Sequence, residues 1–248
     1  MGPADGTTFY VTGGGSGIGR HLAVLMAGRG AAVAVLDRDL SGDSRAEIEA
    51  ARPDRNNPVS FHEVDVCDPV GVEAALRAAI DRVGPPILAV NSAGISTNDR
   101  FEVARADDFE RTVRVNLFGS RNFAAAVLPF MPPGGRLGLI SSLAGLTGGY
   151  TYSAYAASKA GVIGLARVLR LEYAPAGIGI SVICPPEIMT PMIEQYATTM
   201  HPATRALKDV AGTLPIDAAC REILEGLDAG RFMVIPGRRA RRVATMSR

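Results

Sequence analysis

The stretch Phe9-Tyr10-Val11-Thr12-Gly13-Gly14-Gly15-Ser16-Gly17-Ile18-Gly19 joins a short apolar run to a cluster of glycines. Helical spacing then extends from Ser16 to Arg29, with Leu22, Leu25 and Met26 on one side. This order predicts a strand, a tight turn and a helix. Glycines in such a turn let the backbone approach a phosphate group held at the N-terminus of the helix. The candidate residues for this phosphate site are Gly13, Gly15, Ser16, Gly17, Ile18 and Gly19.

The glycine spacing here is Gly-x-x-x-Gly-x-Gly, which differs from the more common Gly-x-Gly-x-x-Gly. Because a strand precedes the turn and a helix follows it, the context favours a dinucleotide over a purely structural turn. Another ligand of the same kind of fold, such as a methyl-donor nucleotide, is an alternative.

Outward from this turn, apolar runs alternate with helical patterns along the chain. Further strands are expected at 31–36, 59–65, 87–91, 136–141, 179–184 and 232–235, and further helices at 41–51, 69–83, 107–131 and 153–174. Such alternation calls for a parallel sheet with helices on both faces, and right-handed crossovers restrict it to a doubly wound order. The predicted fold class is therefore α/β, a Rossmann-type doubly wound parallel sheet of about seven strands.

Composition and charge narrow the class of protein. The chain has 248 residues, 47% hydrophobic and 21% charged, and no Pro/Gly/Ser-rich linker divides it, so we expect a single domain over 1–248. A net charge of +1 without a basic stripe argues against nucleic acid as a partner. The N-terminus lacks a signal pattern and no window suits a transmembrane helix, which predicts a cytoplasmic protein. Three scattered cysteines lack the spacing of a metal site.

Asp37 closes the second predicted strand, eighteen residues after Gly19. A carboxylate at this position hydrogen-bonds the ribose hydroxyls of an adenosine and repels a 2′-phosphate, so it favours NAD over NADP. Arg38 and Arg20 lie close enough in sequence to pair with a phosphate, which keeps NADP as the less favoured alternative.

Other candidate cofactor residues follow the next strands. Asp65 and Val66 come after the third strand, where they would close on the adenine, and Asn91, Ala93 and Gly94 come at the end of the fourth. Carboxyl ends of parallel strands are where such folds bind ligands. Each of these segments is equally consistent with a plain turn.

Tyr155 and Lys159 lie four residues apart in a predicted helix, so they share one face. An ammonium beside a phenol favours the ionised phenol and would lower its pKa. The pair is therefore a candidate for proton transfer to or from an oxygen. An amphipathic helix with a lysine extended toward solvent is the alternative.

Together these motifs resemble the short-chain dehydrogenase/reductase family, in its branch of about 250 residues, over nearly the whole chain. The segments that carry the resemblance are Thr12–Gly19, Asn91–Gly94, Val115-Asn116-Leu117, Ile140-Ser141-Ser142-Leu143-Ala144-Gly145 and Tyr155–Lys159. Ser142 lies thirteen residues before Tyr155, where the family has its catalytic serine.

The resemblance implies a catalytic tetrad of Asn116, Ser142, Tyr155 and Lys159. Tyr155 would be the general acid or base, and Ser142 would hydrogen-bond the substrate oxygen. Lys159 would also hold the nicotinamide ribose, and Asn116 would hold a water that relays protons from Lys159 to solvent. Through the same family the helices at 107–131 and 153–174 would pair across a twofold axis, giving a homodimer or homotetramer.

The segment Cys184-Pro185-Pro186-Glu187-Ile188-Met189-Thr190-Pro191 departs from the family, in which many members carry Pro-Gly after the sixth strand. Because proline lacks the backbone freedom of glycine, we expect a different loop path there. Pro185, Ile188 and Thr190 remain candidate cofactor contacts. A substrate lid is expected at about 187–212, with apolar residues Met189, Met192, Ile193, Tyr196 and Met200 that would line it or pack beneath it as core.

The C-terminal part shows a weaker resemblance to 3-ketodihydrosphingosine reductases. This resemblance implies a lipid-like ketone and NADPH, and NADPH conflicts with Asp37. The arginines at 238, 239, 241, 242 and 248 predict a basic, solvated tail over 238–248.

The combined expectation is an NAD-dependent oxidoreductase that interconverts a secondary alcohol and a ketone. The expected substrate is a small molecule, which can be apolar, and no metal site is expected. Two alternatives stand beside it. One is an NADPH-dependent reductase of a long-chain keto lipid, and the other is a non-catalytic NAD-sensing or scaffold protein on the same fold.

Overall fold

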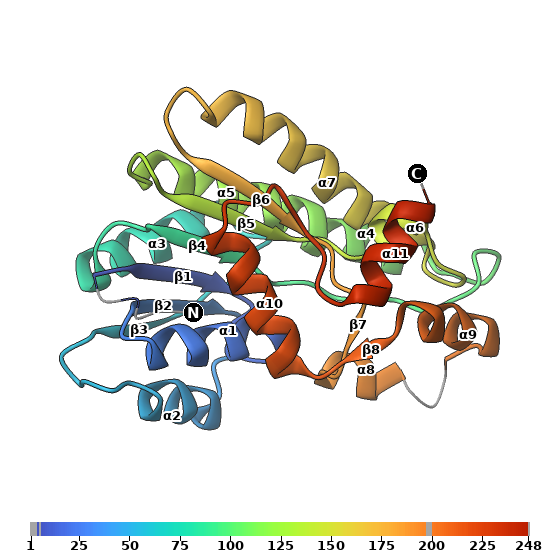
Figure 1. Cartoon of the computed structure of the whole chain (residues 1–248), viewed down its shortest axis with the longest axis horizontal. Coiled ribbons are helices and arrows are strands. Elements are labelled where there is room, and N and C mark those ends of the chain that lie inside the picture. Colours follow the sequence, from blue (N-terminus) through green and yellow to red (C-terminus); the bar gives the residue numbers. More distant parts are fainter. Residues whose placement is uncertain (1–3, 5, 197–199, 248) are drawn as a thin grey trace.

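A parallel seven-stranded sheet forms the centre of the molecule, in a computed structural model that describes residues 4, 6–196 and 200–247 (Figure 1). The strand order is β3-β2-β1-β4-β5-β6-β9. The strands are β1 (Thr8–Thr12), β2 (Ala32–Asp37), β3 (Val59–Glu63), β4 (Leu88–Asn91), β5 (Arg136–Ile140), β6 (Gly179–Ile183) and β9 (Met233–Val234). This arrangement confirms the predicted doubly wound α/β class.

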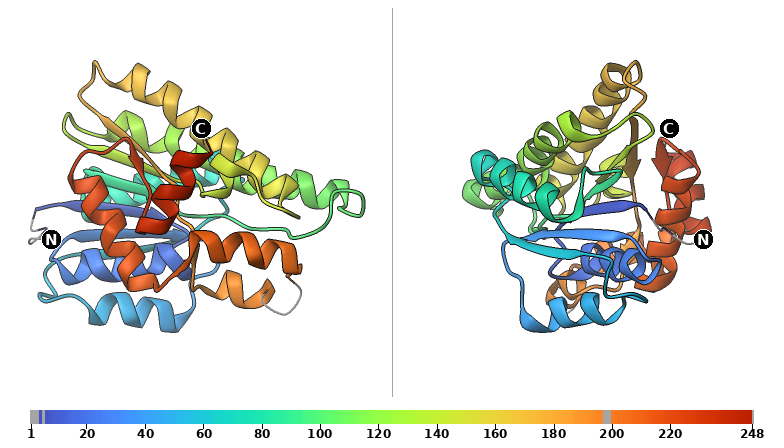
Figure 2. Two further views of the ribbon diagram at one scale, coloured as in Figure 1. Left: turned by 45° about the vertical axis from the view of Figure 1, so that its right-hand side comes forward. Right: turned by 90° about the vertical axis from the view of Figure 1, so that its left-hand side faces the viewer.

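Helices cover both faces of this sheet (Figure 2). The crossover helices are α1 (Gly17–Gly28), α2 (Gly42–Ala50), α3 (Pro69–Val83), α4 (Ala106–Val113), α5 (Gly119–Val127), α7 (Ser153–Tyr173) and α10 (Ile216–Asp228). Helix α1 packs with α2 and α10, whereas α3 packs with α5 and α4 packs with α7. The sheet is thus the middle of three layers.

Strand β1 shows why its sequence is apolar at successive positions. Phe9 and Val11 belong to one buried hydrophobic cluster and Tyr10 belongs to the other, and all three are 0% exposed. Successive side chains of a strand point to opposite faces, so a strand covered on both sides needs apolar residues at every position.

Helix starts follow the capping signals in the sequence. The Asp68 carboxylate accepts a hydrogen bond from the Val70 N–H at 3.1 Å, and Pro69 occupies the first helical position of α3. The Ser41 side chain likewise accepts from the Ser44 N–H at the start of α2.

The helix expected over 107–131 is not a single regular α-helix. Between α4 and α5 the chain forms a π turn, η1 (Arg114–Phe118), and the run ends in a 3-10 turn, η2 (Leu128–Phe130). A π turn inserts one extra residue into the helical repeat and is common at functional sites. Asn116 lies at the centre of this turn.

After β6 the chain builds a small unit beside the sheet from β7 (Glu187–Ile188), α8 (Pro191–Tyr196), α9 (Pro202–Ala211) and β8 (Thr213–Leu214). Strands β7 and β8 pair in parallel, separately from the main sheet. This unit occupies the region expected as the lid. The backbone of Met200 is described, but the side chain of Tyr196 lies outside the described residues.

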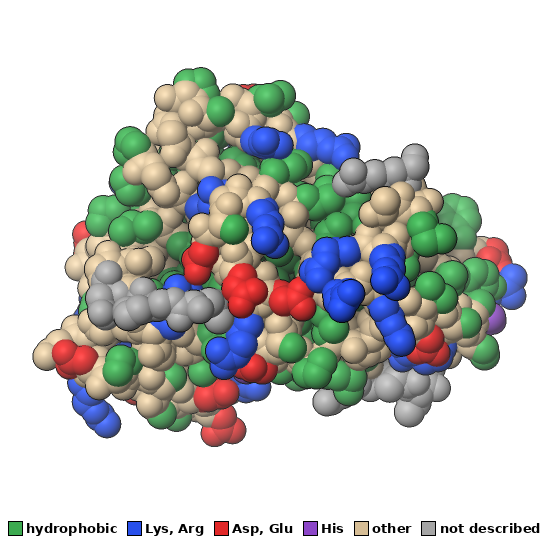
Figure 3. Space-filling view, viewed as in Figure 1, with side chains coloured by type: hydrophobic (Ala, Val, Ile, Leu, Met, Phe, Trp, Pro, Cys, Tyr) green, Lys and Arg blue, Asp and Glu red, His purple; other side chains and the backbone are tan. Residues whose placement is uncertain are grey.

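The arginine-rich C-terminal segment, expected as a basic, solvated tail, folds as a helix. Helix α11 (Arg238–Met246) buries Ala240 and Ala244 against Leu143 and Ala211. Its arginines are exposed, and basic side chains gather over α11 in Figure 3. Within the described part of the chain, no helix has both the length and the apolar character needed to cross a membrane. A short helix, α6 (Ala144–Thr147), precedes α7.

Candidate active site

One large pocket of about 1060 Å³ opens where the parallel strands end. Most of the residues expected to bind cofactor or substrate line it: Gly13, Gly15, Ser16, Gly17, Ile18, Asp37, Arg38, Asp65, Val66, Ala93, Gly94, Ser142, Tyr155, Lys159, Pro185, Ile188 and Thr190. Three expected residues, Gly19, Asn91 and Asn116, are not among the lining residues. The topology therefore brings together segments that are far apart in sequence.

The glycine turn has the conformation that only glycine adopts without strain. Gly13 and Gly17 have φ angles of +67° and +52°. Gly19 faces inward, since a Cβ there would stand 2.2 Å from the carbonyl oxygen of Gly13. Gly19 thus lets α1 pack closely against the end of β1, and it lies behind the residues that line the pocket.

Asp37 both shapes this turn and faces the pocket. Its carboxylate accepts hydrogen bonds from the Gly15 N–H at 2.8 Å and from the Asp39 N–H at 3.0 Å. Arg38 is exposed at the pocket edge, whereas Arg20 forms an ion pair with Glu47 at 3.3 Å. Only Arg38 of the two candidate arginines therefore lines the pocket.

A buried chain of hydrogen bonds explains where Asn91 and Asn116 lie. The Thr12 hydroxyl donates to Asn91 at 2.6 Å, the Asn91 amide donates to Ser120 at 2.9 Å, and the Ser120 hydroxyl donates to the Asn116 carbonyl at 2.5 Å. The Asn116 amide then donates to the Ser158 hydroxyl at 2.9 Å. The chain runs behind the pocket, from the glycine turn to α7.

The Asn116 side chain is fully used by the protein itself. Besides its bond to Ser158, the amide donates to the Ile95 carbonyl at 2.9 Å, and its oxygen accepts from the Ile95 N–H at 2.8 Å. A Cβ on Gly94 would lie 3.1 Å from this oxygen and 3.2 Å from the Lys159 ammonium. Asn116 therefore anchors the loop after β4 beside Lys159, and its expected role with a water stays a prediction.

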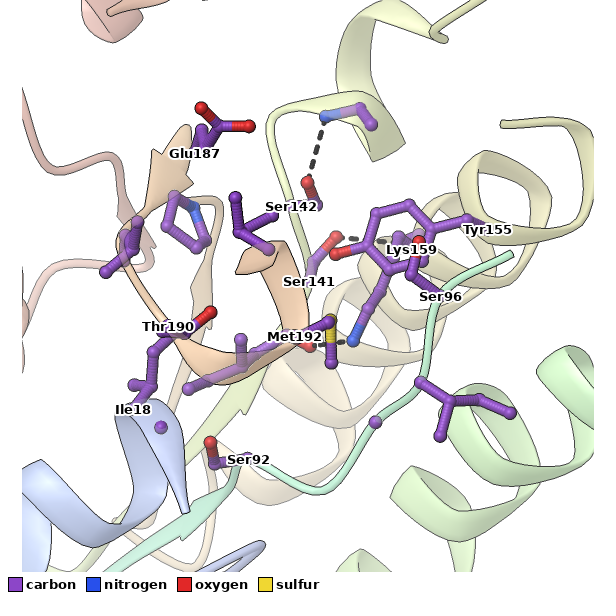
Figure 4. A pocket seen from close by; sticks show the side chains of 18 of the residues that line it. Ile18, Ser92, Ser96, Ser141, Ser142, Tyr155, Lys159, Glu187, Thr190 and Met192 are labelled. Carbon is purple, nitrogen blue, oxygen red and sulfur yellow. Dashed lines mark hydrogen bonds between the residues drawn. The ribbon is translucent and has the colours of Figure 1, made fainter. Parts of the chain in front are cut away.

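Tyr155 and Lys159 project from α7 toward the end of β5, where Ser141 and Ser142 lie (Figure 4). The Lys159 ammonium donates to the Ile140 carbonyl at 2.9 Å and stands 5.7 Å from the centroid of the Tyr155 ring. The neighbouring Ser141 hydroxyl donates to the Lys159 carbonyl at 2.8 Å. These bonds fix the start of α7 against the sheet.

The protonation of this pair differs from the sequence expectation. Burial raises the pKa of Tyr155 to about 12, and a hydrogen bond with Ser142 only partly offsets this rise. Burial also lowers the pKa of Lys159 to about 8. The protein alone therefore does not have the lowered tyrosine pKa that the sequence suggested, because desolvation of the buried phenol is the largest effect on it.

The sequence model described as short chain dehydrogenase matches residues 7–201. The chain belongs to the short-chain dehydrogenase/reductase family. It is 30% identical to 3-dehydrosphinganine reductase of Danio rerio, over 92% of this chain and 70% of the relative. It is 32% identical to Oxidoreductase UcpA of Escherichia coli K12, over 94% of this chain and 88% of the relative.

Among solved structures, levodione reductase superimposes with a TM-score of 0.85 at 30% identity, covering 95% of this chain and 96% of that one. As a short-chain dehydrogenase/reductase, the protein is an oxidoreductase that acts on CH–OH groups. The methyl-donor alternative for the glycine turn finds no support in these matches.

Further residues of this dehydrogenase face the pocket without having been named as site residues. Among them are Tyr152, Glu187, Lys208 and Val243, from the N-cap of α7, from β7, from α9 and from α11. The last two lie beyond the 7–201 match. Lys208 is one of only two lysines in the chain, and this rarity was the one sequence signal that pointed to it.

Proposed function

We propose that the protein is an NAD-dependent oxidoreductase that interconverts a secondary alcohol and a ketone. The observation that carries this proposal is the placement of Ser142, Tyr155 and Lys159 in the same pocket as the glycine turn and Asp37. When bound, the nicotinamide would accept or supply the hydride. The residues fit a dinucleotide, because the glycine turn leaves backbone space and Asp37 offers a carboxylate to a ribose.

In this proposal Tyr155 exchanges a proton with the substrate oxygen. With a pKa of about 12, its phenol is protonated at neutral pH and is ready to donate to the oxygen of a ketone being reduced. In alcohol oxidation the same residue must act as a base, which requires a lower pKa. The positive charge of oxidised nicotinamide would supply that shift.

Ser142 and Lys159 support this proton transfer. The Ser142 hydroxyl accepts a hydrogen bond from the Ala144 N–H at 3.1 Å and is itself hydrogen-bonded with Tyr155, so the two hydroxyls lie together where a substrate oxygen would bind. Lys159 is buried, and a single protein oxygen, that of Ile140, receives a hydrogen bond from its ammonium among the bonds found in the described residues. Its remaining N–H groups suit a ribose hydroxyl.

A second candidate is an NADPH-dependent reductase of a long-chain keto lipid, favoured by the similarity to 3-dehydrosphinganine reductase. The substrate end of the pocket also has an apolar wall, made by Met192, Ile193, Leu207, Val210, Ala211 and Val243. Asp37 opposes the NADPH part of this candidate, since its charge would repel a 2′-phosphate. A panel of long-chain keto lipids and simple secondary alcohols, run with both cofactors, separates the two candidates.

Tyr155→Phe tests the proposed chemistry. We expect kcat/KM to fall by at least about a thousandfold, because the phenol proton has no replacement, while NAD still binds. Tyr173→Phe, on the same helix but outside the pocket, is the matched control. Near wild-type turnover of Tyr155→Phe would reject the mechanism. Binding of NAD without turnover of any compound in a broad panel would instead support the non-catalytic alternative.

A further inference from the structure

Glu187 carries a carboxylate that is buried at the edge of the pocket. Its side chain is 2% exposed, yet all of its charge is compensated by neighbours. Arg205 and Lys208 each donate to it at 2.6 Å, and the Thr213 hydroxyl donates at 2.8 Å. These bonds keep the pKa of Glu187 below its usual value in spite of burial.

The three donors come from the two segments that follow the pocket loop. Arg205 and Lys208 are three residues apart on α9, so both reach down from the same helix face. Thr213 is paired with Glu187 itself between β8 and β7. One carboxylate therefore joins α9 and β8 to the strand that begins after Pro185-Pro186.

Strand β7 also leads directly to the glycine turn. Thr190 follows it, and its side chain lies 3.7 Å from the position of a Cβ on Gly17. Figure 4 shows Thr190 beside Ile18, with Glu187 on the other side of the loop. The same short segment thus contacts the nucleotide end of the pocket and carries the anchor for α9.

Helix α9 forms part of the pocket wall. Its lining residues are Thr204, Leu207, Lys208, Val210 and Ala211. The Lys208 ammonium stands 5.3 Å from the centroid of the Tyr152 ring, which lies 5.5 Å from the Tyr155 ring. The position of α9 therefore sets the space available next to Tyr155.

We propose that Glu187 is a positioning residue whose carboxylate holds α9 as the outer wall of the substrate end of the pocket. Substrate affinity depends on this anchor, whereas nucleotide affinity does not. The proposal rests on the proposed function in taking the end of the pocket near Tyr155 as the substrate site. It explains why this loop carries a glutamate after its two prolines.

Glu187→Gln keeps the shape of the side chain and removes its charge. Lys208 then loses the carboxylate that compensates it in a partly buried place, whereas Arg205 keeps its ion pair with Asp209 at 3.1 Å. The uncompensated charge of Lys208 favours release of α9. Glu73→Gln is the control, because Glu73 also accepts from an arginine, Arg77 at 2.8 Å, but lies on α3 and does not line this pocket. Lys208→Gln provides a second test if Glu187→Gln folds poorly.

The experiment is hydrogen exchange of the full chain, followed by titration with NAD and by kinetics on the best compound of the panel. In Glu187→Gln, amides of α9 are expected to exchange at least about tenfold faster, while those of β6 stay unchanged. We expect KM to rise at least about tenfold, with the dissociation constant of NAD within about twofold of the wild type. Glu73→Gln leaves α9 exchange and KM unchanged.

Unchanged α9 exchange in both Glu187→Gln and Lys208→Gln would overturn the proposal, as would an NAD affinity that falls as much as substrate affinity. The exchange measurement needs no turnover. Failure of the oxidoreductase mechanism, seen with Tyr155→Phe, is therefore separable from failure of this anchor.

Discussion

Replacing Asp37 by asparagine is expected to remove the discrimination against NADP. The carboxylate faces the pocket and is held in place by the N–H groups of Gly15 and Asp39, at 2.8 and 3.0 Å. Asparagine has nearly the same shape and keeps one oxygen that can accept from Gly15. The turn is therefore retained while the negative charge is lost.

The size of the effect follows from the charge. Two unit charges about 5 Å apart repel by about 3 kcal/mol at an effective dielectric constant of about 20. A phosphate monoester carries more than one charge at neutral pH, but salt screens an open site, so a gain of about 2 to 3 kcal/mol is expected. This gain corresponds to an NADP affinity about 30- to 150-fold higher. NAD binding is expected to weaken by no more than about tenfold, through a weaker hydrogen bond to the ribose.

Dissociation constants of both nucleotides, measured by calorimetry at one fixed salt concentration, test this prediction. Glu63→Gln is the control, because Glu63 ends the neighbouring strand in register with Asp37 and does not line the pocket. An unchanged NAD-to-NADP ratio in Asp37→Asn would refute the electrostatic reasoning. So would an equal change in the Glu63→Gln control.

Three further predictions concern stability and assembly. Gly19→Ala places a Cβ 2.2 Å from the Gly13 oxygen, and we expect it to lower the free energy of unfolding in urea by at least about 2 kcal/mol and to abolish NAD binding. Gly42→Ala is the control, because no atom lies within 4 Å of its Cβ, and we expect it to change the free energy of unfolding by less than about 0.5 kcal/mol. Because the pKa of Lys159 falls from 10.5 when unfolded to about 8 when folded, unfolding takes up a proton between these values. Relative to Lys159→Met, the wild type is therefore expected to gain about 2 kcal/mol of stability from pH 8 to about pH 9.5. The comparison with the variant is needed because burial raises the pKa values of Cys67, Cys184 and Cys220, which act in the opposite direction over this range. Leu171 is 76% exposed and lies on α7, the helix expected to pair in a dimer. We therefore expect Leu171→Arg to be monomeric by light scattering. A wild-type protein that is already monomeric would contradict the pairing of this helix.

The order of strands and helices was predictable because each element carries its own local signal. The strands are apolar at successive positions, as in Phe9-Tyr10-Val11, and α3 begins at the N-cap Asp68 followed by Pro69, as the sequence predicts. The glycine turn, Asp37 and the Tyr155–Lys159 pair were recognisable since each depends on residues close together in sequence.

Features that depend on distant partners were not predictable. The π turn at Asn116 leaves no compositional mark, and the Ile95 backbone that binds its side chain lies twenty-one residues away. The raised pKa of Tyr155 reflects burial that spacing alone does not reveal. The arginine-rich C-terminus looked like a tail because its anchoring residues, Ala240 and Ala244, find their apolar partners only in the folded chain.

The buried chain from Thr12 through Asn91, Ser120 and Asn116 to Ser158 has a consequence for how this sequence can evolve. Thr12, Asn91 and Ser120 are joined side chain to side chain, and so are Asn116 and Ser158, whereas Ser120 reaches Asn116 only at its main-chain carbonyl. One apolar replacement within either group therefore leaves a buried polar partner without its hydrogen bond. Compensated double changes avoid that penalty. Natural variation is therefore expected to be correlated within each of these two groups, even though none of the five side chains lines the pocket.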